Sequence, residues 1–300
     1  MAHDFHYADG ALDRVGERRE DAAWLAERLQ DATTLFYPVW RGRCLVRTAP
    51  VEAPFILDGR QAVELAELGQ AHLLGIGDGI AHFAIDASHH EEEALAAWQV
   101  EAKQLRDVAL TFERRPAALL AYARGLVHWN QTHRFCGACG SPTASARAGH
   151  MRRCENAECG RMHFPRTDPA VIMLVIDGDR CLLARRRIWQ VGRRSTVAGF
   201  VEPGETLEDA VRREVKEEVG ITVGRAEYQG SQPWPFPASL MMGYRAWAED
   251  TDITVDGDEI SEADWYRRED LVTGLADGTL TLPPVDSISR WLIDCWRDEG

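Results

Sequence analysis

The chain lacks any long hydrophobic segment. Among its 300 residues the longest apolar run extends from Pro169 to Ile176, far short of the roughly 20 residues that a membrane-spanning helix requires. A run of this length is typical of a buried strand. The sequence therefore excludes an integral membrane protein with spanning helices. With 45% hydrophobic residues, it predicts a globular protein of about two domains.

The sequence also lacks the signals of an exported protein. Its N-terminus, Met-Ala-His-Asp-Phe-His, has no basic segment followed by an apolar stretch, so no secretory signal peptide is recognisable. The seven cysteines are an odd number, and four of them fall between residues 136 and 159. That spacing is typical of metal binding and unlike a disulfide framework. We therefore expect a cytoplasmic protein.

Positive charge is in deficit over most of the chain. The formal net charge of −14 argues against a protein that binds nucleic acid indiscriminately through a basic surface. Between Cys136 and Phe200, however, there are eleven arginines, no lysine and only five acidic residues. Anionic ligands are expected in this part, although ordinary solvated surface would give the same composition.

The first 130 residues mix helix and strand signals and carry no chemical motif. The patterns predict helices over residues 21–30, 91–109 and 116–132 and strands over 36–46 and 80–85. Further strands are expected over residues 169–176, 181–184, 230–237, 240–248 and 261–266, and a terminal helix over 287–297. Together these elements predict an α/β protein.

Two cysteine pairs form a strong metal-binding motif. Cys136-Gly-Ala-Cys139 is followed after fourteen residues by Cys154-Glu-Asn-Ala-Glu-Cys159. Thiolates at the tips of two tight turns converge tetrahedrally on zinc, and four sulfur ligands leave no open position, so we expect a structural ion. It would supply on the order of 10 kcal/mol of folding free energy to a segment with little apolar surface. A site that uses His150 or His163 in place of one cysteine, and free buried thiols, remain as alternatives.

A capped helix carrying three glutamates is predicted over residues 207–219. Thr206 followed by Asp209 forms a start that resembles a capping box, and Gly220 is a natural stop. Glu214, Glu217 and Glu218 stand at positions i, i+3 and i+4 and therefore share one face.

Three like charges on one face repel one another and require compensation. Mg²⁺ and Mn²⁺ supply it naturally, because these hard cations prefer carboxylate oxygens and are often bound together with substrate phosphates. Arg213 is one turn from Glu217 and is placed to pair with it or with Glu205. An acidic helix face turned to solvent is the alternative.

The stretch from Gly199 to Ile221 resembles the Nudix box, Gly-x5-Glu-x7-Arg-Glu-U-x-Glu-Glu-x-Gly-U with U aliphatic, and matches it at every defined position. Downstream, the segment from Ser231 to Ser239, SQPWPFPAS, resembles the SQPWPFPxS array of the NADH pyrophosphatase (NudC-type) branch. The four-cysteine ribbon belongs to the same branch. The resemblance implies a Nudix α/β/α sandwich with a mixed sheet over residues 168–300, a zinc ribbon over 132–167 and an N-terminal Nudix-like α/β domain over 1–131.

The resemblance also implies roles for individual residues. The ligands of the catalytic Mg²⁺ or Mn²⁺ would be Glu214, Glu217, Glu218, the main-chain oxygen of Ala198, and Glu259; one of the three box glutamates would also serve as base. Phe164 stands where relatives have a tyrosine beside the substrate, which leaves a hydrogen bond from that hydroxyl in doubt. The implied substrate-binding residues are Phe164, Phe200, Gln232, Pro233, Trp234, Pro235, Phe236, Pro237, Ala238, Ser239 and Met241. In this segment the prolines would hold Trp234 and Phe236 as rigid faces for stacking.

The implied activity is hydrolysis of the pyrophosphate of NADH or NAD⁺ to nicotinamide mononucleotide and AMP. Removal of NAD caps from RNA 5′ ends, with the ribbon and its arginines binding the RNA, is a second reading. A Nudix fold that binds ligand or nucleic acid without catalysis is a third. The family resemblance also implies a homodimer.

Overall fold

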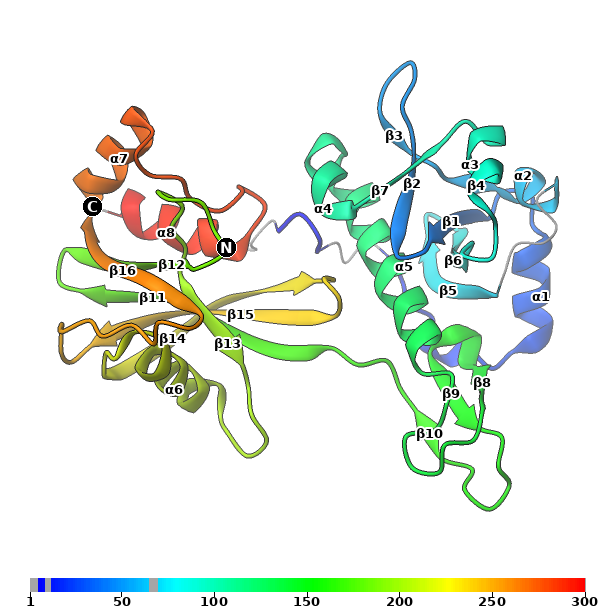
Figure 1. Ribbon diagram of the computed structural model, residues 1–300. Helices are drawn as coiled ribbons and strands as arrows, with labels where there is room; N and C mark the ends of the chain where they lie inside the picture. Colours follow the sequence, from blue (N-terminus) through cyan, green and yellow to red (C-terminus); the bar gives the residue numbers. More distant parts are fainter. Residues whose placement is uncertain (1–4, 9–11, 65–69, 300) are drawn as a thin grey trace. The chain divides into compact units, whose positions relative to one another are not determined.

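Two compact units make up the chain in the computed structural model, which describes residues 5–8, 12–64 and 70–299 (Figure 1). Unit 1 comprises Met1–Phe5, Thr167–Trp234 and Ser239–Gly300. Unit 2 comprises His6–Arg166 and the short segment Pro235–Ala238. The first four residues, on which the expectation about export largely depends, lie outside the described part.

Unit 1 contains a six-stranded mixed sheet. Five strands follow the order β14-β15-β11-β12-β16, and β13 pairs with β11. The central pair β11 and β15 is parallel, whereas the other pairs are antiparallel. The strands are β11 (Asp168–Asp177), β12 (Arg180–Arg186), β13 (Val197–Phe200), β14 (Val223–Trp234), β15 (Ser239–Ala248) and β16 (Ile260–Arg267).

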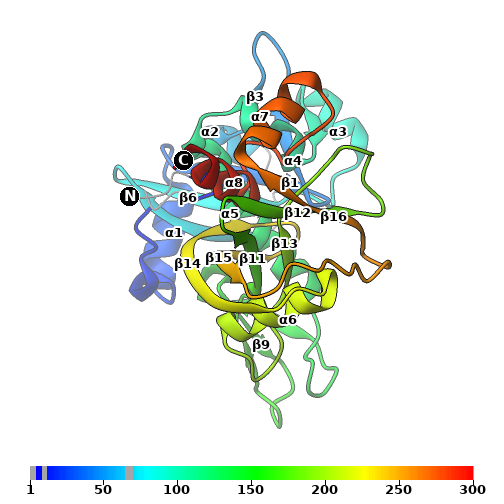
Figure 2. The ribbon, with the colours of Figure 1, turned by 90° about the vertical axis from the view of Figure 1, so that its left-hand side faces the viewer.

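Helices cover both faces of this sheet (Figures 1 and 2). On one face α6 (Leu207–Val219) packs against β11, β13 and β14, and on the other α8 (Ile288–Asp298) packs against β11, β14 and β15. The helix α7 (Arg268–Asp277) follows β16 and packs against it. Val211, Val215 and Val219 are fully buried in the core beneath α6, as their spacing predicts. The expected α/β/α sandwich is confirmed.

Unit 2 contains a second mixed sheet, of seven strands, in the order β3-β2-β1-β6-β5, with β4 pairing to β1 and β7 to β2. Its central pair β1 and β6 is parallel. The strands are β1 (Leu35–Trp40), β2 (Arg43–Arg47), β3 (Ala53–Pro54), β4 (Leu57–Asp58), β5 (Ala71–Gly77), β6 (Ile80–Asp86) and β7 (Glu101–Lys103). The helices are α1 (Ala22–Gln30), α2 (Gly59–Glu64), α3 (Glu92–Ala97), α4 (Leu105–Val108) and α5 (Arg114–Thr132), with 3₁₀ turns η1 (Gly16–Arg18), η2 (Ala109–Thr111) and η3 (Arg147–Gly149).

The two large sheets share one topology. In each, a central strand pairs in parallel with a later one (β1 with β6, β11 with β15), and that later strand also pairs with the strand before it in sequence. In each, the first strand of the pair also forms a hairpin with its successor and carries an additional short antiparallel strand, β4 or β13. A helix follows that short strand in both cases. The expected N-terminal Nudix-like domain is therefore confirmed.

The ribbon is a small antiparallel sheet within unit 2. Its strands β8 (Thr143–Ala146), β9 (Met151–Cys154) and β10 (Met162–His163) follow the order β10-β9-β8. One face is anchored by the buried Arg152, which donates hydrogen bonds to Thr143 and to Asn130 of α5.

Among the described helices, none is long and apolar enough to cross a bilayer.

Two predicted elements of unit 2 are wrong in their extent. The strand expected over residues 36–46 is a hairpin, because Arg41 and Gly42 both adopt positive φ and form the two-residue turn that suits twisted antiparallel strands. The helix expected over 91–109 is interrupted by β7, which pairs with β2. Pairing with a distant strand here outweighs the local helical pattern. In unit 1, β14 begins at Val223 and ends at Trp234, whereas a strand over 230–237 was expected.

His72, on β5, makes the stability of unit 2 depend on pH. The side chain is 1% exposed, and burial lowers its pKa to about 4, with His150 and Arg152 adding repulsion and Asp86 opposing it. His72 therefore takes up a proton near pH 6.5 in the unfolded chain but only near pH 4 in the folded chain. The free energy of unfolding falls as the pH drops through this range.

We predict that the His72→Gln variant loses part of this acid sensitivity. The difference in unfolding free energy between pH 7.5 and pH 4.5, from urea titrations, should be smaller in the variant than in the wild type by up to about 3 kcal/mol. Acid release of zinc affects both proteins equally and cancels in the comparison. Equal differences in the two proteins would contradict the assignment.

Candidate functional site

The helix α6 begins and ends where its capping residues predict. The Thr206 hydroxyl accepts a hydrogen bond from the main-chain N–H of Asp209 and donates one to its carboxylate. At the other end Gly220 adopts φ +76°, a conformation that a residue without Cβ takes at little cost. These two caps fix the register of the helix, and with it the direction in which its glutamates point.

The three α6 glutamates differ in burial. The Glu218 residue is 6% exposed, and the side chain of Glu214 is 13% exposed, whereas that of Glu217 is 60% exposed. Arg213 donates hydrogen bonds from the same Nη1 atom to Glu214 (2.8 Å) and Glu217 (3.0 Å). The helix therefore presents two largely buried carboxylates and one exposed carboxylate, and the Arg213 guanidinium group pairs with Glu214 and Glu217.

Arg213 also joins the preceding loop to the helix. Its guanidinium group forms two hydrogen bonds with the Glu205 carboxylate and donates a third to the carbonyl oxygen of Phe200 at 2.8 Å. The bonds from Arg213, and a main-chain N–H of Glu202, lower the pKa of Glu205 to about 2. Both pairings expected for Arg213 are thus present together, and Arg213 holds the loop against α6.

Glu218 is a buried carboxyl without sufficient partners. Its Oε2 atom is buried and has no hydrogen-bond donor. Burial raises the pKa of Glu218 to about 8, with Glu259 and Glu214 adding repulsion and Arg186 opposing it. A buried carboxylate oxygen without a donor is costly unless a cation neutralises it. The residues present therefore fit a hard divalent cation.

Glu214 lies directly against the main chain of β13. A Cβ atom on Gly199 would come within 1.9 to 2.2 Å of the Glu214 carboxyl atoms, which is far inside van der Waals contact. Gly199 pairs with Val171 of β11, and Ala198 pairs with Ile172. The close approach of the Glu214 carboxylate therefore requires glycine at the first position of the box. Ala198 precedes Gly199 on β13, so its main chain lies next to this point of approach.

Glu259 lies in the same electrostatic neighbourhood. It immediately precedes β16, and its charge raises the pKa of both Glu214 and Glu218. Its Oε1 atom is 2.6 Å from Nη2 of Arg186. Asp256, which the sequence analysis did not single out, accepts hydrogen bonds from the main-chain N–H groups of Glu259 and Ile260 and so fixes this turn.

The arginines at the end of β12, and Arg194 beyond it, are engaged within the protein. Arg185 pairs with Glu262 and donates to the carbonyl oxygen of Trp189, and Arg186 pairs with Glu259. Arg194, 8% exposed, bonds to Glu262 and to the Tyr266 hydroxyl. These contacts support the turn that carries Glu259.

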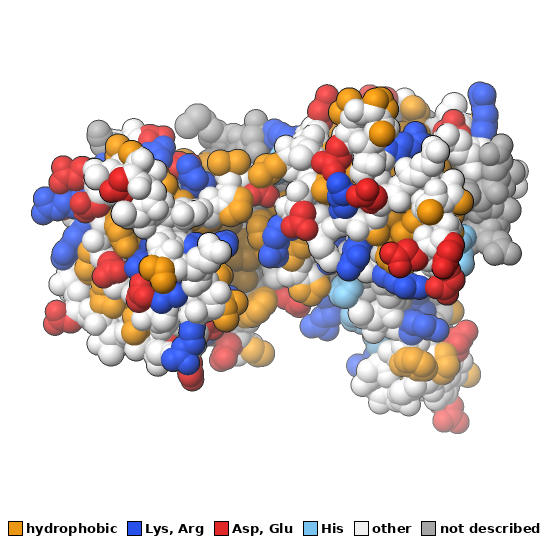
Figure 3. Space-filling model, turned by 45° about the horizontal axis from the view of Figure 1, so that its top comes forward, with side chains coloured by type: hydrophobic (Ala, Val, Ile, Leu, Met, Phe, Trp, Pro, Cys, Tyr) orange, Lys and Arg blue, Asp and Glu red, His pale blue; other side chains and the backbone are white. Residues whose placement is uncertain are grey.

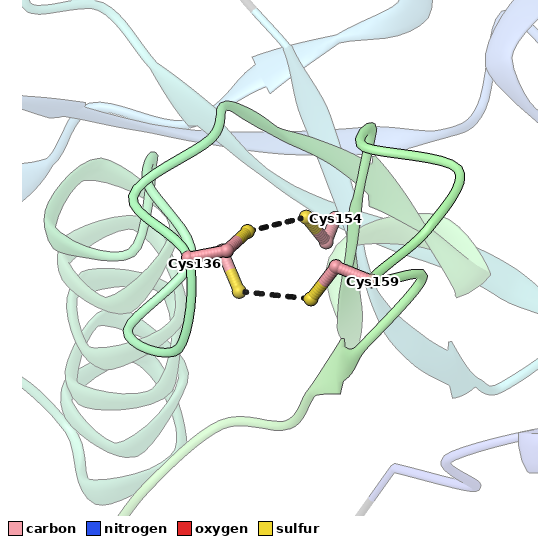
Figure 4. Close-up of side chains that lie close together, drawn as sticks. Cys136, Cys154 and Cys159 are labelled. Atoms are coloured by element: carbon pink, nitrogen blue, oxygen red, sulfur yellow. Dashed lines mark hydrogen bonds between the residues drawn. The ribbon is translucent and has the colours of Figure 1, made fainter.

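The four cysteines of the ribbon form a closed metal site. Their sulfur atoms all lie within 4.8 Å of one another, with 3.8 Å between Cys136 and Cys159 and 3.5 Å between Cys139 and Cys154. Four sulfurs at about 2.3 Å from one zinc ion are about 3.8 Å apart, so the site fits zinc. Figure 4 shows the thiols of Cys136, Cys154 and Cys159 pointing toward a common centre.

The converging group consists of the four cysteines, without His150 or His163 as a ligand. His150 donates its Nε2–H to the carbonyl oxygen of Leu73, away from the cysteines, and His163 is not part of the cluster. Among the described side chains, the four cysteines alone form a group of metal-ligating atoms that converge this closely. The three α6 carboxylates do not form such a group, and Glu217, which pairs with Arg213, is the exposed one.

The SQPWPFPAS segment is divided between two environments. Gln232 is fully buried; its amide donates to the carbonyl oxygen of Asp286 (2.6 Å) and accepts from the N–H of Ile288 (2.8 Å). It therefore fixes β14 to the start of α8. Pro233 and Trp234 pair with Leu240 and Ser239 in the β14–β15 hairpin, and Gln232 pairs with Met241.

The tip of this hairpin, Pro235–Ala238, belongs to unit 2. The Phe236 ring packs against Tyr7, with 5.6 Å between ring centroids, and lies beneath the guanidinium groups of Arg106 and Arg124. Arg124 also donates to the carbonyl oxygen of Pro235. One face expected for stacking on a ligand is thus already packed against protein. Of the other expected ring positions, Phe164 and Phe200 are 51% and 60% exposed, and Trp234 is half-buried.

Family models match three parts of the chain. A NUDIX domain matches residues 166–285, an NADH pyrophosphatase-like rudimentary NUDIX domain matches 33–129, and an NADH pyrophosphatase zinc ribbon domain matches 131–164.

Two relatives are similar over nearly the whole chain. The NAD-capped RNA hydrolase NudC of Mycobacterium bovis is 37% identical over 301 residues, covering 95% of this chain and 94% of that protein. The human NAD-capped RNA hydrolase NUDT12 is 32% identical over 339 residues, covering 97% of this chain and 73% of that protein. Together with the Nudix box on α6 and the four-cysteine ribbon, these matches show that the chain belongs to the NADH pyrophosphatase (NudC-type) branch of the Nudix hydrolase family.

Proposed function

We propose that this chain hydrolyses the pyrophosphate bond of NADH and NAD⁺, giving nicotinamide mononucleotide and AMP, and cleaves the same bond where NAD caps an RNA 5′ end. The observation that carries the proposal is the buried Glu218 carboxyl, whose Oε2 atom has no donor and which lies near Glu214 and Glu259. The relatives named as NAD-capped RNA hydrolases support the capped RNA as a substrate.

The α6 carboxylates are the proposed metal ligands. Glu214, Glu217 and Glu218 would hold Mg²⁺ or Mn²⁺ together with Glu259 and the main-chain oxygen of Ala198. Such cations, when bound, stabilise charge on the phosphate oxygens and lower the pKa of water. The chain's own contribution is positional: Gly199 admits the Glu214 carboxylate, and Arg213 holds the box loop to the helix.

For the substrate, we propose that the exposed rings of Phe164 and Phe200 and the hairpin from Gln232 to Met241 bind the dinucleotide. Gln232 would act as a positioning residue, because both ends of its amide are bonded to the main chain at the start of α8. We assign catalysis to residues 168–300, the ribbon to 132–167 and the Nudix-like domain to 1–131, in a cytoplasmic homodimer.

Product analysis tests the activity. Purified protein with Mg²⁺ should convert NADH to reduced nicotinamide mononucleotide and AMP and release nicotinamide mononucleotide from NAD-capped RNA. Glu217→Gln and Glu218→Gln should each lower kcat for NADH at least about a hundredfold, since a carboxylate ligand or base is removed. The exposed Glu269 of α7 provides a control, and Glu269→Gln should retain full activity.

Stability measurements on the same variants exclude misfolding as the cause. At pH 8.5, where the Glu218 carboxyl is ionised, replacing it by a neutral amide removes a buried charge near other acids, so the urea midpoint of Glu218→Gln in cation-free buffer should equal or exceed that of the wild type. Full NADH cleavage by either glutamine variant, or cleavage by the wild type without any divalent cation, would contradict the proposal.

Gly199→Ala tests the close approach of Glu214 to β13. The added Cβ would meet the carboxyl at 1.9 Å, so we expect the carboxylate to be displaced and kcat for NADH to fall at least about tenfold. Gly125→Ala is the matched control, because a Cβ there meets nothing within 4 Å. Adding Glu214→Gln to Gly199→Ala should cost little more, because the two changes disable one group. Additive losses would show that Gly199 acts otherwise.

A further inference from the structure

The outer face of the ribbon sheet exposes apolar and cationic side chains together. Met162 lies opposite Arg153, which lies opposite Ala144, and side chains directly opposite in an antiparallel sheet share a face. Met162 is 55% exposed, and Phe135, paired with Pro142 beyond β8, is 65% exposed. In Figure 3 the surface of the ribbon, at lower right, shows hydrophobic side chains beside charged ones.

The inner face of the ribbon sheet is buried and carries an arginine that has partners. Arg152 alternates with Arg153 along β9 and is buried, bonded to Thr143 and to Asn130 of α5. The ribbon is thus anchored through one face. The face that carries Met162 and Arg153 is turned away from this anchor.

The ribbon carries an excess of cations without partners. Between residues 131 and 166 there are six arginines and two glutamates, and both glutamates lie in the Cys154–Cys159 turn. Four of the arginines are exposed, and none of their guanidinium groups has a hydrogen-bond or ion-pair partner among the described residues: Arg134, Arg153, Arg161 and Arg166. In a chain of net charge −14, this local excess marks the ribbon as a surface for an anion.

We propose that the outer face of the ribbon, formed by Phe135, Arg153 and Met162 with the neighbouring arginines, binds single-stranded RNA. Guanidinium groups pair with phosphates, and exposed rings and thioethers provide platforms for unstacked bases. This proposal rests on the proposed function only for the choice of RNA, the chain attached to the cap. Binding itself requires no catalysis.

A second copy of this chain fits the face less well. A two-fold contact would bring the patch against itself and place unpaired arginines opposite one another, with no acidic partner to neutralise them. A single-stranded polynucleotide supplies a negative charge and a base at every residue, which matches both features of the surface.

The test measures binding of the full chain, without added divalent cation, to an uncapped, fluorescently labelled single-stranded RNA of about 16 nucleotides, the upper site size of small single-strand binding folds. The double variant Phe135→Ala/Met162→Ala should bind about tenfold more weakly. Leu110→Ala, which truncates another exposed apolar side chain of unit 2, should bind like the wild type.

The salt dependence of binding tests the arginines. Arg153→Gln should reduce the slope of log Kd against log salt by about 0.7, whereas Arg43→Gln, at an exposed position on β2, should leave the slope unchanged.

Two measurements keep the result interpretable. Each variant should retain one zinc per chain and cleave free NADH at the wild-type rate, so a folding defect or a failure of the proposed function is distinguished from a failure at the ribbon. Wild-type RNA affinity in the double variant would overturn the proposal. So would a dimer that dissociates in the double variant while RNA affinity is unchanged, which would assign the face to a second copy.

Discussion

The accumulation of carboxyl groups beside β13 is the constraint on which unit 1 depends. Glu214 and Glu218 are both largely withdrawn from water, and burial raises the pKa of each, with Glu259 adding repulsion. Proteins tolerate such a cluster where a cation compensates it. Arg213 and Arg186 neutralise part of the charge, and they do so from the edges, leaving Oε2 of Glu218 without a donor. The remaining charge is what a divalent cation would neutralise.

The surrounding fold holds these acids in place against their repulsion. Val211, Val215 and Val219 bury one side of α6 in the core, so the helix cannot rotate to release the glutamates into water. Arg213 ties the loop residue Glu205, and Phe200 at the end of β13, to the same helix, and Asp256 fixes the turn that carries Glu259. Gly199 is the matching feature of the sheet, since any larger residue would occupy the space of the Glu214 carboxylate. The residue types required at these positions of the Nudix box therefore follow from close packing around the carboxyl groups.

Features encoded by neighbouring residues were predictable, and those that depend on distant partners were not. The bounds of α6 follow from Thr206 and Gly220, and the zinc site follows from the spacing of the cysteines, because both are local chemistry. Gln232 shows the opposite case, because its hydrogen-bond partners lie 54 and 56 residues away. The motif indicates a binding segment, and it could not reveal that this side chain is buried and joins β14 to the start of α8. The interruption of the predicted helix over 91–109 by β7 likewise depends on pairing with β2. The environment of Phe236 depends on Tyr7, Arg106 and Arg124, far away in sequence.

The most direct test of the central claim is anomalous diffraction at the manganese edge from crystals of the full chain grown with Mn²⁺. The account predicts an anomalous peak in direct contact with the Glu218 carboxylate, with Glu214 and Glu217 as further ligands. A peak elsewhere on the protein, with a hydrogen bond from a protein donor or a water molecule satisfying Oε2 of Glu218 instead, would contradict it.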